Sequence, residues 1–385
     1  MRIHQMICAL VLLALPLRVQ AQEVELAEEM TPSQTSGDAF GSDKAASPMM
    51  FRTLLQVRQQ QTAFATGNAQ ERAMTQALDG WQLQRMFVRL AARPTSWLEA
   101  KVLTDFAEPW NGNPMHVVKL AYADIDLHER VHVRVGLQKL PMSLLELLPI
   151  VEFELADRGF VDDLIKNTGF GGRDVGATLR VDPLPKTKWL HLSAGAFTGQ
   201  ATGTQAQVAP LLGFRAESHP WKHLRLGVDW LWRRNPATVI SVNGNQQQMA
   251  AGTAGSADVA LHWKPFELRA EVVWGDRSDE RDRLDARTYL GAWLIAVGKI
   301  KLGKATVRPT ARFEVLDADR EHDTGRRELI SGAVNVDVGA VRVVLDVSQR
   351  ILQPGSVPLG MKVQGSPPYQ EVGSTRVVLQ LQVAI

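Results

Sequence analysis

The chain has 385 residues, of which 45% are hydrophobic and 22% charged, and its formal net charge at pH 7 is +2. A charge this close to zero gives no electrostatic basis for a nucleic-acid partner. The one cysteine, Cys8, lies close to the N-terminus. If that segment is removed on export, the mature chain can form no disulfide and offers no thiolate ligand for a metal.

Residues 1–21 are predicted to be a cleaved export signal. Arg2 and His4 give a weakly basic start, Met6 to Leu17 form an apolar run, and Val19-Gln20-Ala21 offers small residues for cleavage after Ala21. The apolar run is shorter than the about 20 residues that a membrane-spanning helix needs. Cys8 precedes the cleavage site, so no lipid anchor is predicted. The chain is therefore expected to leave the cytoplasm.

Residues 22–50 are polar and small, and we predict a flexible segment there. From residue 51 onward the dominant period of hydrophobicity is two, as in residues 224–233. There the apolar residues are Leu224, Leu226, Val228, Trp230 and Trp232, and the alternate positions are Arg225, Gly227, Asp229 and Arg233, with Leu231 breaking the polar series. Such alternation predicts strands with one apolar and one polar face.

Sixteen strands are predicted, most of them 9 to 13 residues long. They are residues 51–59, 82–91, 96–106, 115–126, 130–139, 173–182, 188–198, 207–217, 222–234, 255–264, 266–275, 286–298, 305–317, 328–338, 340–350 and 375–385. This length suits a tilted membrane crossing, and the connections alternate between short and long, as in outer-membrane barrels. We therefore predict that residues 51–385 form an all-β, antiparallel up-and-down transmembrane β-barrel, with periplasmic turns and external loops. Fourteen strands is the alternative if residues 51–59 are helical.

Tryptophans support a membrane barrel because they fall near the ends of predicted strands, where interfacial girdles place amphipathic rings. These residues are Trp81, Trp97, Trp110, Trp189, Trp221, Trp263 and Trp274. A scatter of tryptophans in a soluble core is the alternative.

Residues 51–199 resemble the phosphate-selective porin family of the O/P type. The resemblance lies in Phe51-Arg-Thr-Leu-Leu-Gln-Val-Arg, Gln82-Leu-Gln-Arg-Met-Phe-Val-Arg-Leu, Arg134-Val-Gly-Leu-Gln-Lys-Leu-Pro141 and Gly172-Arg-Asp-Val-Gly-Ala177, the last followed by a strand that ends in Gly195-Ala-Phe-Thr-Gly199. The resemblance implies a sixteen-stranded, homotrimeric barrel in the outer membrane of a Gram-negative bacterium. Phosphate selectivity is not carried over, because the arginine ladder and lysine cluster of phosphate channels cannot be located here.

The predicted function is passive diffusion of small polar solutes or ions, and the candidate site is the wall of the lumen. The pore-lining and constriction residues are predicted to be Arg85, Arg89, Lys101, Arg134, Glu146, Glu152, Glu154, Arg158, Arg173, Arg180, Arg225, Arg269, Arg308, Arg312 and Arg342. Cations slightly outnumber acids on the inferred inward face, which favours a weak anion preference. A structural or adhesive barrel that is plugged by its own loop is the alternative.

The longest connection, 139–173, is the third on the long-loop side and is expected to fold into the barrel. Its leucines would then pack on the inner wall, and its charged residues would face the passage beside Arg134 and Arg180. Those charged residues are Glu146, Glu152, Glu154, Arg158, Asp162 and Asp163. Replacement of Asp229 by arginine on the inward face is expected to be tolerated and to alter selectivity.

No catalytic residue, metal or cofactor is predicted, and the expected partners are outer-membrane lipid and small solutes or anions. His128-Glu-Arg-Val-His132 matches the spacing of zinc peptidases, which requires a helix. The alternation of Val131, Val133 and Val135 predicts a strand instead. On one strand the two histidines would lie about 13 Å apart, too far to share a metal ion.

Overall fold

The computed structural model describes residues 49–65, 79–109, 117–182, 189–199, 210–234, 237–240, 246–249, 252–277, 287–321, 325–352 and 373–385. The chain divides into two compact units, 1–30 and 31–385, and every described residue belongs to the second. The predicted export signal, residues 22–48 and Trp110 lie outside the described residues.

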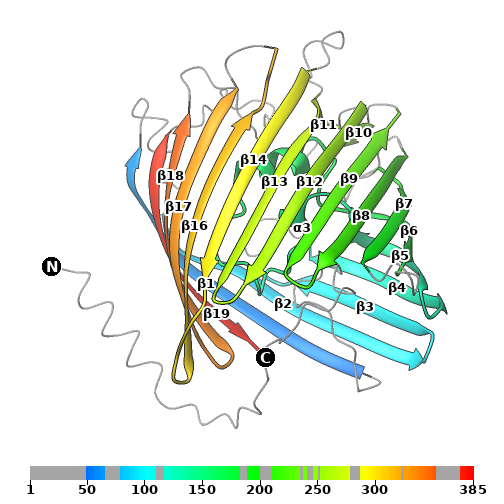
Figure 1. Cartoon of the computed structure of the whole chain (residues 1–385), viewed down its shortest axis with the longest axis horizontal. Helices are drawn as coiled ribbons and strands as arrows, with labels where there is room; N and C mark the ends of the chain where they lie inside the picture. Colours follow the sequence, from blue (N-terminus) through cyan, green and yellow to red (C-terminus); the bar gives the residue numbers. More distant parts are fainter. Residues whose placement is uncertain are drawn as a thin grey trace. The chain divides into compact units, whose positions relative to one another are not determined.

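The described strands form a closed antiparallel barrel (Figure 1). Its strands are β1 (Met49–Ala65), β2 (Gly80–Thr95), β3 (Leu98–Asp105), β4 (Val118–His128), β5 (Val131–Lys139), β6 (Arg173–Val181), β7 (Leu190–Phe197), β8 (Leu211–Trp221), β9 (Leu224–Arg233), β12 (Gly252–Trp263), β13 (Phe266–Arg277), β14 (Arg287–Gly298), β15 (Ile300–Leu302), β16 (Ala305–Asp317), β17 (Arg326–Val338), β18 (Val341–Leu352) and β19 (Ser374–Ala384). Because β14 and the short β15 pair in turn with β16, they act as one strand. The described barrel thus has sixteen strands, and pairing of β1 with β19 closes it.

The predicted strand count is confirmed. The strand β1 begins at Met49 and has 17 residues, so the alternative with a helix at 51–59 is wrong. The predicted strand 207–217 lies about four residues too early, since β8 spans Leu211–Trp221. A separate hairpin of β10 (Ala237–Ile240) and β11 (Gln246–Met249) was not predicted, because its residues carry no long alternating pattern.

The period of two separates an apolar outside from a polar inside. On β9, the Val228 side chain is 51% exposed and Trp230 is 43% exposed, whereas Asp229 between them is fully buried. Trp97, Trp189, Trp221 and Trp263 are exposed at the ends of strands that meet in short connections. The outer surface therefore carries the apolar face and part of the aromatic girdle that a lipid bilayer requires.

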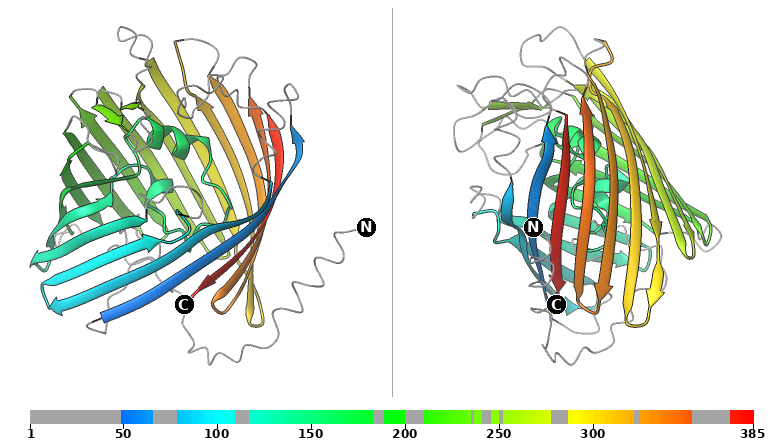
Figure 2. Two further views of the ribbon diagram at one scale, coloured as in Figure 1. Left: turned by 180° about the vertical axis from the view of Figure 1, so that it is seen from behind. Right: turned by 90° about the vertical axis from the view of Figure 1, so that its left-hand side faces the viewer.

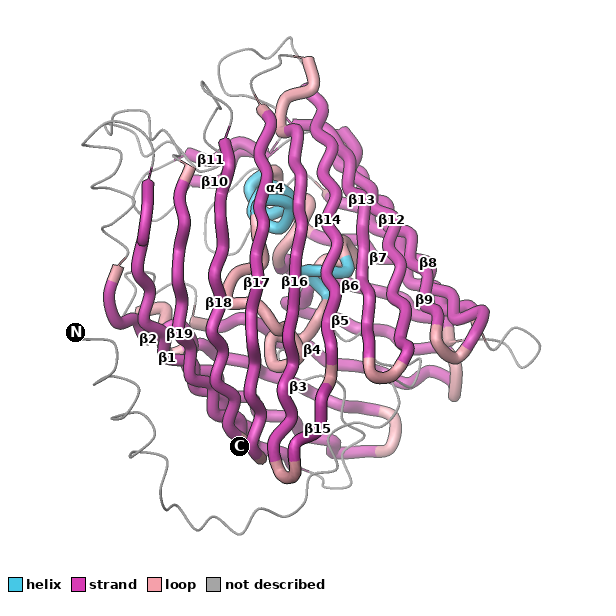
Figure 3. Tube along the Cα trace, turned by 60° about the vertical axis from the view of Figure 1, so that its left-hand side comes forward, coloured by secondary structure: helices cyan, strands magenta, loops and turns pink. Residues whose placement is uncertain are grey.

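The lumen contains two short helices, α3 (Leu144–Leu147) and α4 (Phe160–Asn167), both in the connection between β5 and β6. The two views in Figure 2 show this connection crossing the interior, and Figure 3 shows the helices behind the strands of the wall. Within the described part of the chain, no helix has the length and apolarity needed to cross a membrane.

Candidate functional site

The inner wall is lined by the charged residues that alternate with the outward apolar ones. On β9, Arg225, Asp229 and Arg233 are buried on the inward face, together with Leu231. The other strand cations of the predicted site lie on the same face, except that Arg173 lies at the end of β6, in register with Lys139. The alternation was therefore sufficient to assign the faces of the wall.

The connection 140–172, here called the inward loop, packs on the inner side of β9 and β12 to β18. Its apolar side chains and those of the wall form one continuous buried cluster. From the loop the cluster includes Leu140, Met142, Leu144, Leu145, Leu148, Phe153, Leu155, Phe160, Val161, Leu164, Ile165 and Phe170, and from the wall it includes Leu231, Val273, Trp293, Ile295, Leu316 and Leu329. Each fully buried side chain of this kind contributes about 1.5–3 kcal/mol relative to exposure in water. The predicted inward fold of this connection is thus confirmed by its contacts.

The first polar attachment of the inward loop is at Ser143. Its backbone N–H donates to Asp229 Oδ2 at 2.8 Å, and its hydroxyl donates to Glu271 Oε2 at 2.8 Å. Leu144 N–H donates to the other oxygen of Glu271 at 3.0 Å. Since Ser143 has φ 67°, in the left-handed region, these bonds hold a backbone conformation that a serine rarely adopts.

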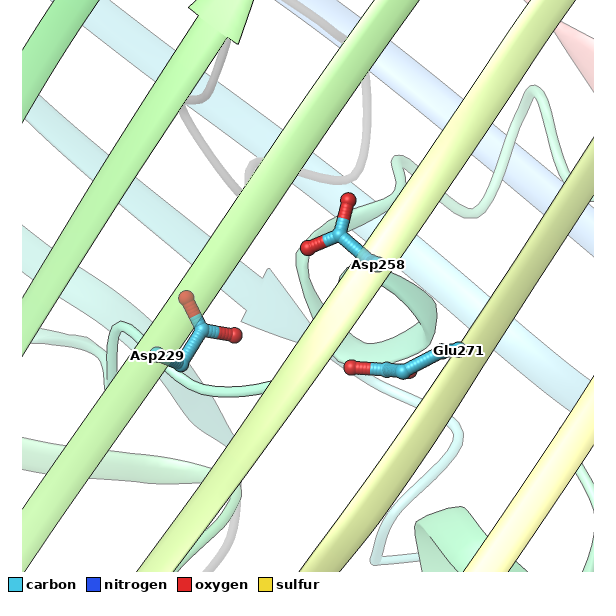
Figure 4. Close-up of side chains that lie close together, drawn as sticks. All are labelled: Asp229, Asp258 and Glu271. Carbon is cyan, nitrogen blue, oxygen red and sulfur yellow. The ribbon is translucent and has the colours of Figure 1, made fainter.

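Asp229, Glu271 and Asp258 lie on three neighbouring strands and form a buried carboxylate cluster (Figure 4). Their ligand oxygens lie within 4.8 Å of one another. Arg215 compensates the charge, with Nη1 at 2.6 Å from Asp229 and 2.9 Å from Asp258. Asp229 and Glu271 also accept the hydrogen bonds from Ser143 and Leu144. The role of the cluster is therefore to hold the loop. The sequence alone predicts that Asp229→Arg is tolerated, but these contacts lead us to expect that it loosens the loop, because the change would remove an acceptor for the loop and oppose Arg215.

A second attachment is an ion pair between Glu154 of the loop and Arg269 of β13. Arg269 Nη1 and Nη2 lie 2.9 and 3.2 Å from the two oxygens of Glu154, and both residues are almost completely buried. Asn335 donates to the backbone oxygen of Glu154 at 2.9 Å. The prediction that Glu154 faces the passage is therefore wrong: its side chain is directed at the wall.

A third attachment surrounds Asp157. Its carboxylate accepts from Arg350 Nη2 at 2.5 Å, and its backbone oxygen accepts from Arg312 Nη1 at 2.8 Å. Burial alone would raise the pKa of Asp157, but the charges of Arg350 and Arg312 hold it below its ordinary value. Val161 N–H donates to Glu314 of β16 at 2.6 Å. Asp157 therefore stays ionised and fastens the loop to β16 and β18.

A further set of charges joins α3 and α4 to each other and to the end of β5. Lys166 Nζ lies 2.8 Å from Glu146 Oε2 and 2.5 Å from Asp162 Oδ2, and Lys139 donates to the backbone oxygen of Glu146. Burial would raise the pKa of Glu146, but Lys166, Lys139 and Arg158 hold it well below its usual range. These partners differ from Arg134 and Arg180, which sequence analysis had placed beside the loop acids.

The wall opposite the attachments, from β2 to β6, pairs most of its charges within itself. Arg134 makes two bonds to Asp124, at 2.8 and 2.9 Å, and Arg180 reaches the same carboxylate at 3.2 Å. Arg134 also stacks over Tyr122, 4.0 Å from the ring centre. Lys101 pairs with Glu99 at 3.1 Å. No loop residue is needed to neutralise these groups.

The tip of the loop reaches this opposite wall. Ile150 and Val151 pack against a second apolar cluster on β1 to β4 that includes Leu54, Phe87 and Tyr122, and Ile150 also contacts the first cluster. The loop thus spans the lumen from one wall to the other, so any passage must run beside it.

A cavity of about 70 Å³ lies beside the loop, along the wall from β5 to β8. Its lining extends from Lys139, Pro141 and Leu147 to Asp182 and His191 at the short-turn end. The charged lining consists of four cations, Arg134, Lys139, Arg180 and Arg215, and two acids, Asp182 and Glu217. Arg215, Glu217 and His191 were not predicted as site residues, although Arg215 and Glu217 do alternate with apolar positions on β8.

The remaining predicted residues have individual partners. Arg85 donates to Gln56 at 2.7 Å, Arg225 lies 3.8 Å from Asp258, Arg308 lies 2.7 Å from Asp337, and Arg342 donates to the backbone oxygen of Val151 at 2.6 Å. Arg89 is buried on the inward face of β2, and Arg158 donates to the backbone oxygen of Leu148 at 2.8 Å. Burial raises the pKa of Glu152. Several predicted cations therefore hold the loop or a neighbouring acid.

No protein-family model matches the chain, and no curated protein sequence matches it. The fold is nevertheless similar to solved structures. An anion-selective porin from Comamonas acidovorans aligns over 88% of this chain and 99% of its own, with 12% identity and a TM-score of 0.58. OmpT of Vibrio cholerae, in its trimer form, has 8% identity and a TM-score of 0.58 over 88% and 99% of the two chains. The outer membrane channel DcaP of Acinetobacter baumannii has 9% identity and a TM-score of 0.57 over 88% and 97%.

The chain therefore has the porin fold. Its apolar outer face and closed strand pairing satisfy the two requirements for a barrel in the outer membrane of a Gram-negative bacterium, and we assign it to that membrane.

Proposed function

We propose that the chain is an outer-membrane porin that allows small polar solutes and ions to diffuse passively, with a weak preference for anions. The observation that carries this proposal is the cavity beside the loop, where four cationic side chains face two acidic ones. An excess of fixed positive charge in a narrow, partly desolvated passage attracts anions and repels cations. The anion-selective porin with the same fold is consistent with this preference.

The preference is expected to be weak because most of the cations are already paired. Arg134 and Arg180 share Asp124, and Arg215 is bound to Asp229, Asp258 and Glu217. A paired guanidinium contributes less field than a free one, so neither phosphate nor any other single anion is singled out. The proposed activity requires no catalytic group.

The second candidate is a structural or adhesive barrel that its own loop closes. The contact of Ile150 and Val151 with the wall of β1 to β4 favours it, because this contact carries the described inward loop across the lumen. Both candidates agree with the fold, and they differ in whether ions pass.

Single-channel recordings in a planar bilayer separate the two. A porin gives discrete conductance steps, and a salt gradient gives a reversal potential displaced modestly toward anions. Deletion of residues 144–157 should then raise the conductance severalfold and weaken the preference, while the purified barrel still migrates differently on a gel when heated. If only the deletion variant conducts, the loop is a plug. If neither conducts although both are folded, the proposed function is wrong.

A homotrimer is also proposed, since OmpT of Vibrio cholerae was solved as a trimer. Cross-linking of the purified protein in mild detergent should give a species of three chains, and a species of one chain at all cross-linker concentrations would contradict it.

A further inference from the structure

One row of residues across three neighbouring strands lines the cavity beside the loop. Arg180 of β6 lies opposite Ser193 of β7, and Ser193 lies opposite Arg215 of β8. All three residues line the cavity. The small serine leaves space between the two long side chains, so this arginine row has a guanidinium group on either side of a hydroxyl group.

Both arginines of this row carry a nitrogen atom that no neighbouring group uses. The Nε atoms of Arg180 and Arg215 are buried and have no hydrogen-bond partner in the described structure, although buried donors normally have one. An arginine Nε can only donate, and a carboxylate is the acceptor that guanidinium groups bind best. The arginine row is therefore suited to the carboxylate of a solute.

A second row, one step nearer the short turns, offers acceptors. Asp182 follows Arg180 by two residues, His191 precedes Ser193 by two residues, and both line the cavity. The Asp182 side chain is 33% exposed, and the hydrogen bond from His191 lowers its pKa, so its carboxylate is ionised at neutral pH. His191 Nε2 is buried and has no hydrogen-bond partner among the described residues. This acceptor row is therefore suited to a cationic donor group.

The two rows are spaced for a small molecule that carries both kinds of group. Residues two apart on a strand lie about 6.6 Å apart along it. The carboxylate and ammonium groups of an α-amino acid span this separation with one hydrogen bond of about 2.8 Å at each end. The cavity has a volume of about 70 Å³, which holds about five atoms of the size of a water molecule at roughly 10–15 Å³ each. This is the size of the smallest amino acids.

The inward loop limits the size of the cavity on its other side. Pro141 and Leu147 line it. A Cβ atom on Gly213 of β8 would lie 2.9 Å from the Pro141 ring, so the loop rests directly on the backbone of this strand. The two apolar side chains can contact a methyl group but leave no room for a long side chain.

The charges around the cavity favour a solute without net charge. Arg180 and Arg134 share Asp124, whereas Arg215 is bound to three acids on β8, β9 and β12. An ion of either sign would bring an unbalanced charge into a partly desolvated site, and such a charge is costly. A zwitterion brings none.

We propose that the arginine row and the acceptor row together bind small zwitterionic solutes, namely α-amino acids such as glycine and alanine. The carboxylate of the solute accepts hydrogen bonds from Arg180, Ser193 and Arg215. Its ammonium group donates to Asp182 and His191. This inference rests on the proposed function, since it names the class of solute for which the diffusion path has a binding site.

The test is saturation-transfer NMR of the full barrel in detergent with L-alanine as the probe, because this method detects weak binding and does not require conduction. Acetate and methylammonium each carry one of the two charges of alanine, and we expect each to bind about tenfold or more weakly than alanine. Asp182→Asn and Arg180→Gln should each weaken alanine binding by about tenfold.

The two variants should have opposite effects on the singly charged probes. Asp182→Asn should weaken the binding of methylammonium and spare that of acetate, and Arg180→Gln should do the reverse, whereas damage to the fold would weaken both. The matched control is Arg308→Gln, since Arg308 is also partly exposed and pairs with an acid, Asp337 at 2.7 Å, but lies on the loop-bearing wall. It should leave alanine binding unchanged.

Heat-modified migration on a gel shows which variants fold. The proposal is overturned if the folded wild-type barrel transfers no saturation to alanine. It is also overturned if acetate binds as tightly as alanine, because the cavity would then be a site for anions alone, or if Arg308→Gln weakens alanine binding as much as Arg180→Gln. A barrel that binds alanine with the expected effects of the variants but conducts no ions would support the site and contradict the proposed diffusion.

Discussion

The two walls of the lumen carry the same types of charged residue, but these residues have different roles on each wall. On the wall from β9 to β18, arginines and acids bind the inward loop, as Arg269 binds Glu154 and Glu271 binds Ser143. On the wall from β2 to β8, most charges are satisfied between neighbouring strands, as Arg134 and Arg180 are by Asp124. An inward charged residue is therefore structural where the loop covers it and is available to solutes where the loop leaves space.

This difference predicts that breaking an ion pair has unequal effects on the two walls. Glu154→Ala leaves Arg269 buried without its bidentate partner, and removal of one member of a buried pair costs about 3–5 kcal/mol. The loop should loosen, which would appear as frequent current fluctuations and faster proteolysis within residues 140–172. Glu99→Ala, which breaks the pair with Lys101 inside the other wall, is the control and should leave the loop protected. Equal proteolysis in both variants would contradict the comparison.

Substitutions on the outer face of the loop-bearing wall should have different effects from substitutions on its inner face. Val228 is directed at lipid, so Val228→Arg should destabilise the barrel by roughly 2–4 kcal/mol near the bilayer midplane. Asp229→Asn, one residue along, should spare the barrel and instead weaken the bond to Ser143. Urea titrations in detergent measure the first effect and loop proteolysis the second. A barrel that tolerates arginine at 228 would mean that this face does not contact lipid.

The charges of the wall from β5 to β8 should set ion preference. Arg180 has a quarter of its side chain exposed and lines the cavity, so Arg180→Glu should move the reversal potential in a salt gradient toward cations. The same exchange at Arg308, which lies between Glu154 and Asp337 on the loop-bearing wall, should have little effect on selectivity. A larger shift from Arg308→Glu would show that solutes pass on the other side of the loop.

The smallest expected effect is a loosening of the loop as the pH rises toward 8. Burial, with the charges of Asp157 and Asp162, raises the pKa of Asp163 in α4 to about 8. A raised carboxyl pKa stabilises the fold while the group is protonated, so the contribution is complete below the ordinary value of 3.8 and is lost as pH rises through about 8. Current fluctuations should therefore increase as the pH rises from about 4 to about 8 and level off above it, and Asp163→Asn should suppress the increase. Asp157, whose pKa is lowered, keeps its contribution throughout this range.

The barrel was predictable because each strand repeats one local rule, as in Leu224 to Arg233, and because the turn and loop lengths alternate. The inward course of residues 140–172 was also predictable, since its leucines would be costly in water. The partners within the lumen were not, because Glu154 and Arg269 are 115 residues apart and meet only through the curvature of the closed sheet. Alternation assigns a residue to a face and carries no information about which residue lies across the lumen.

The closing pair of strands has a consequence for the order in which the molecule is built. Leu54 of β1 lies opposite Ala384 of β19, so the barrel cannot close before its C-terminal strand has arrived. The inward loop likewise depends on partners made later in the chain, among them Arg269, Arg312 and Arg350. Contacts so distant in sequence form slowly. Until they form, the apolar loop and an open sheet edge are exposed together, and this half-built state is the one that assembly factors in the periplasm would have to protect from aggregation.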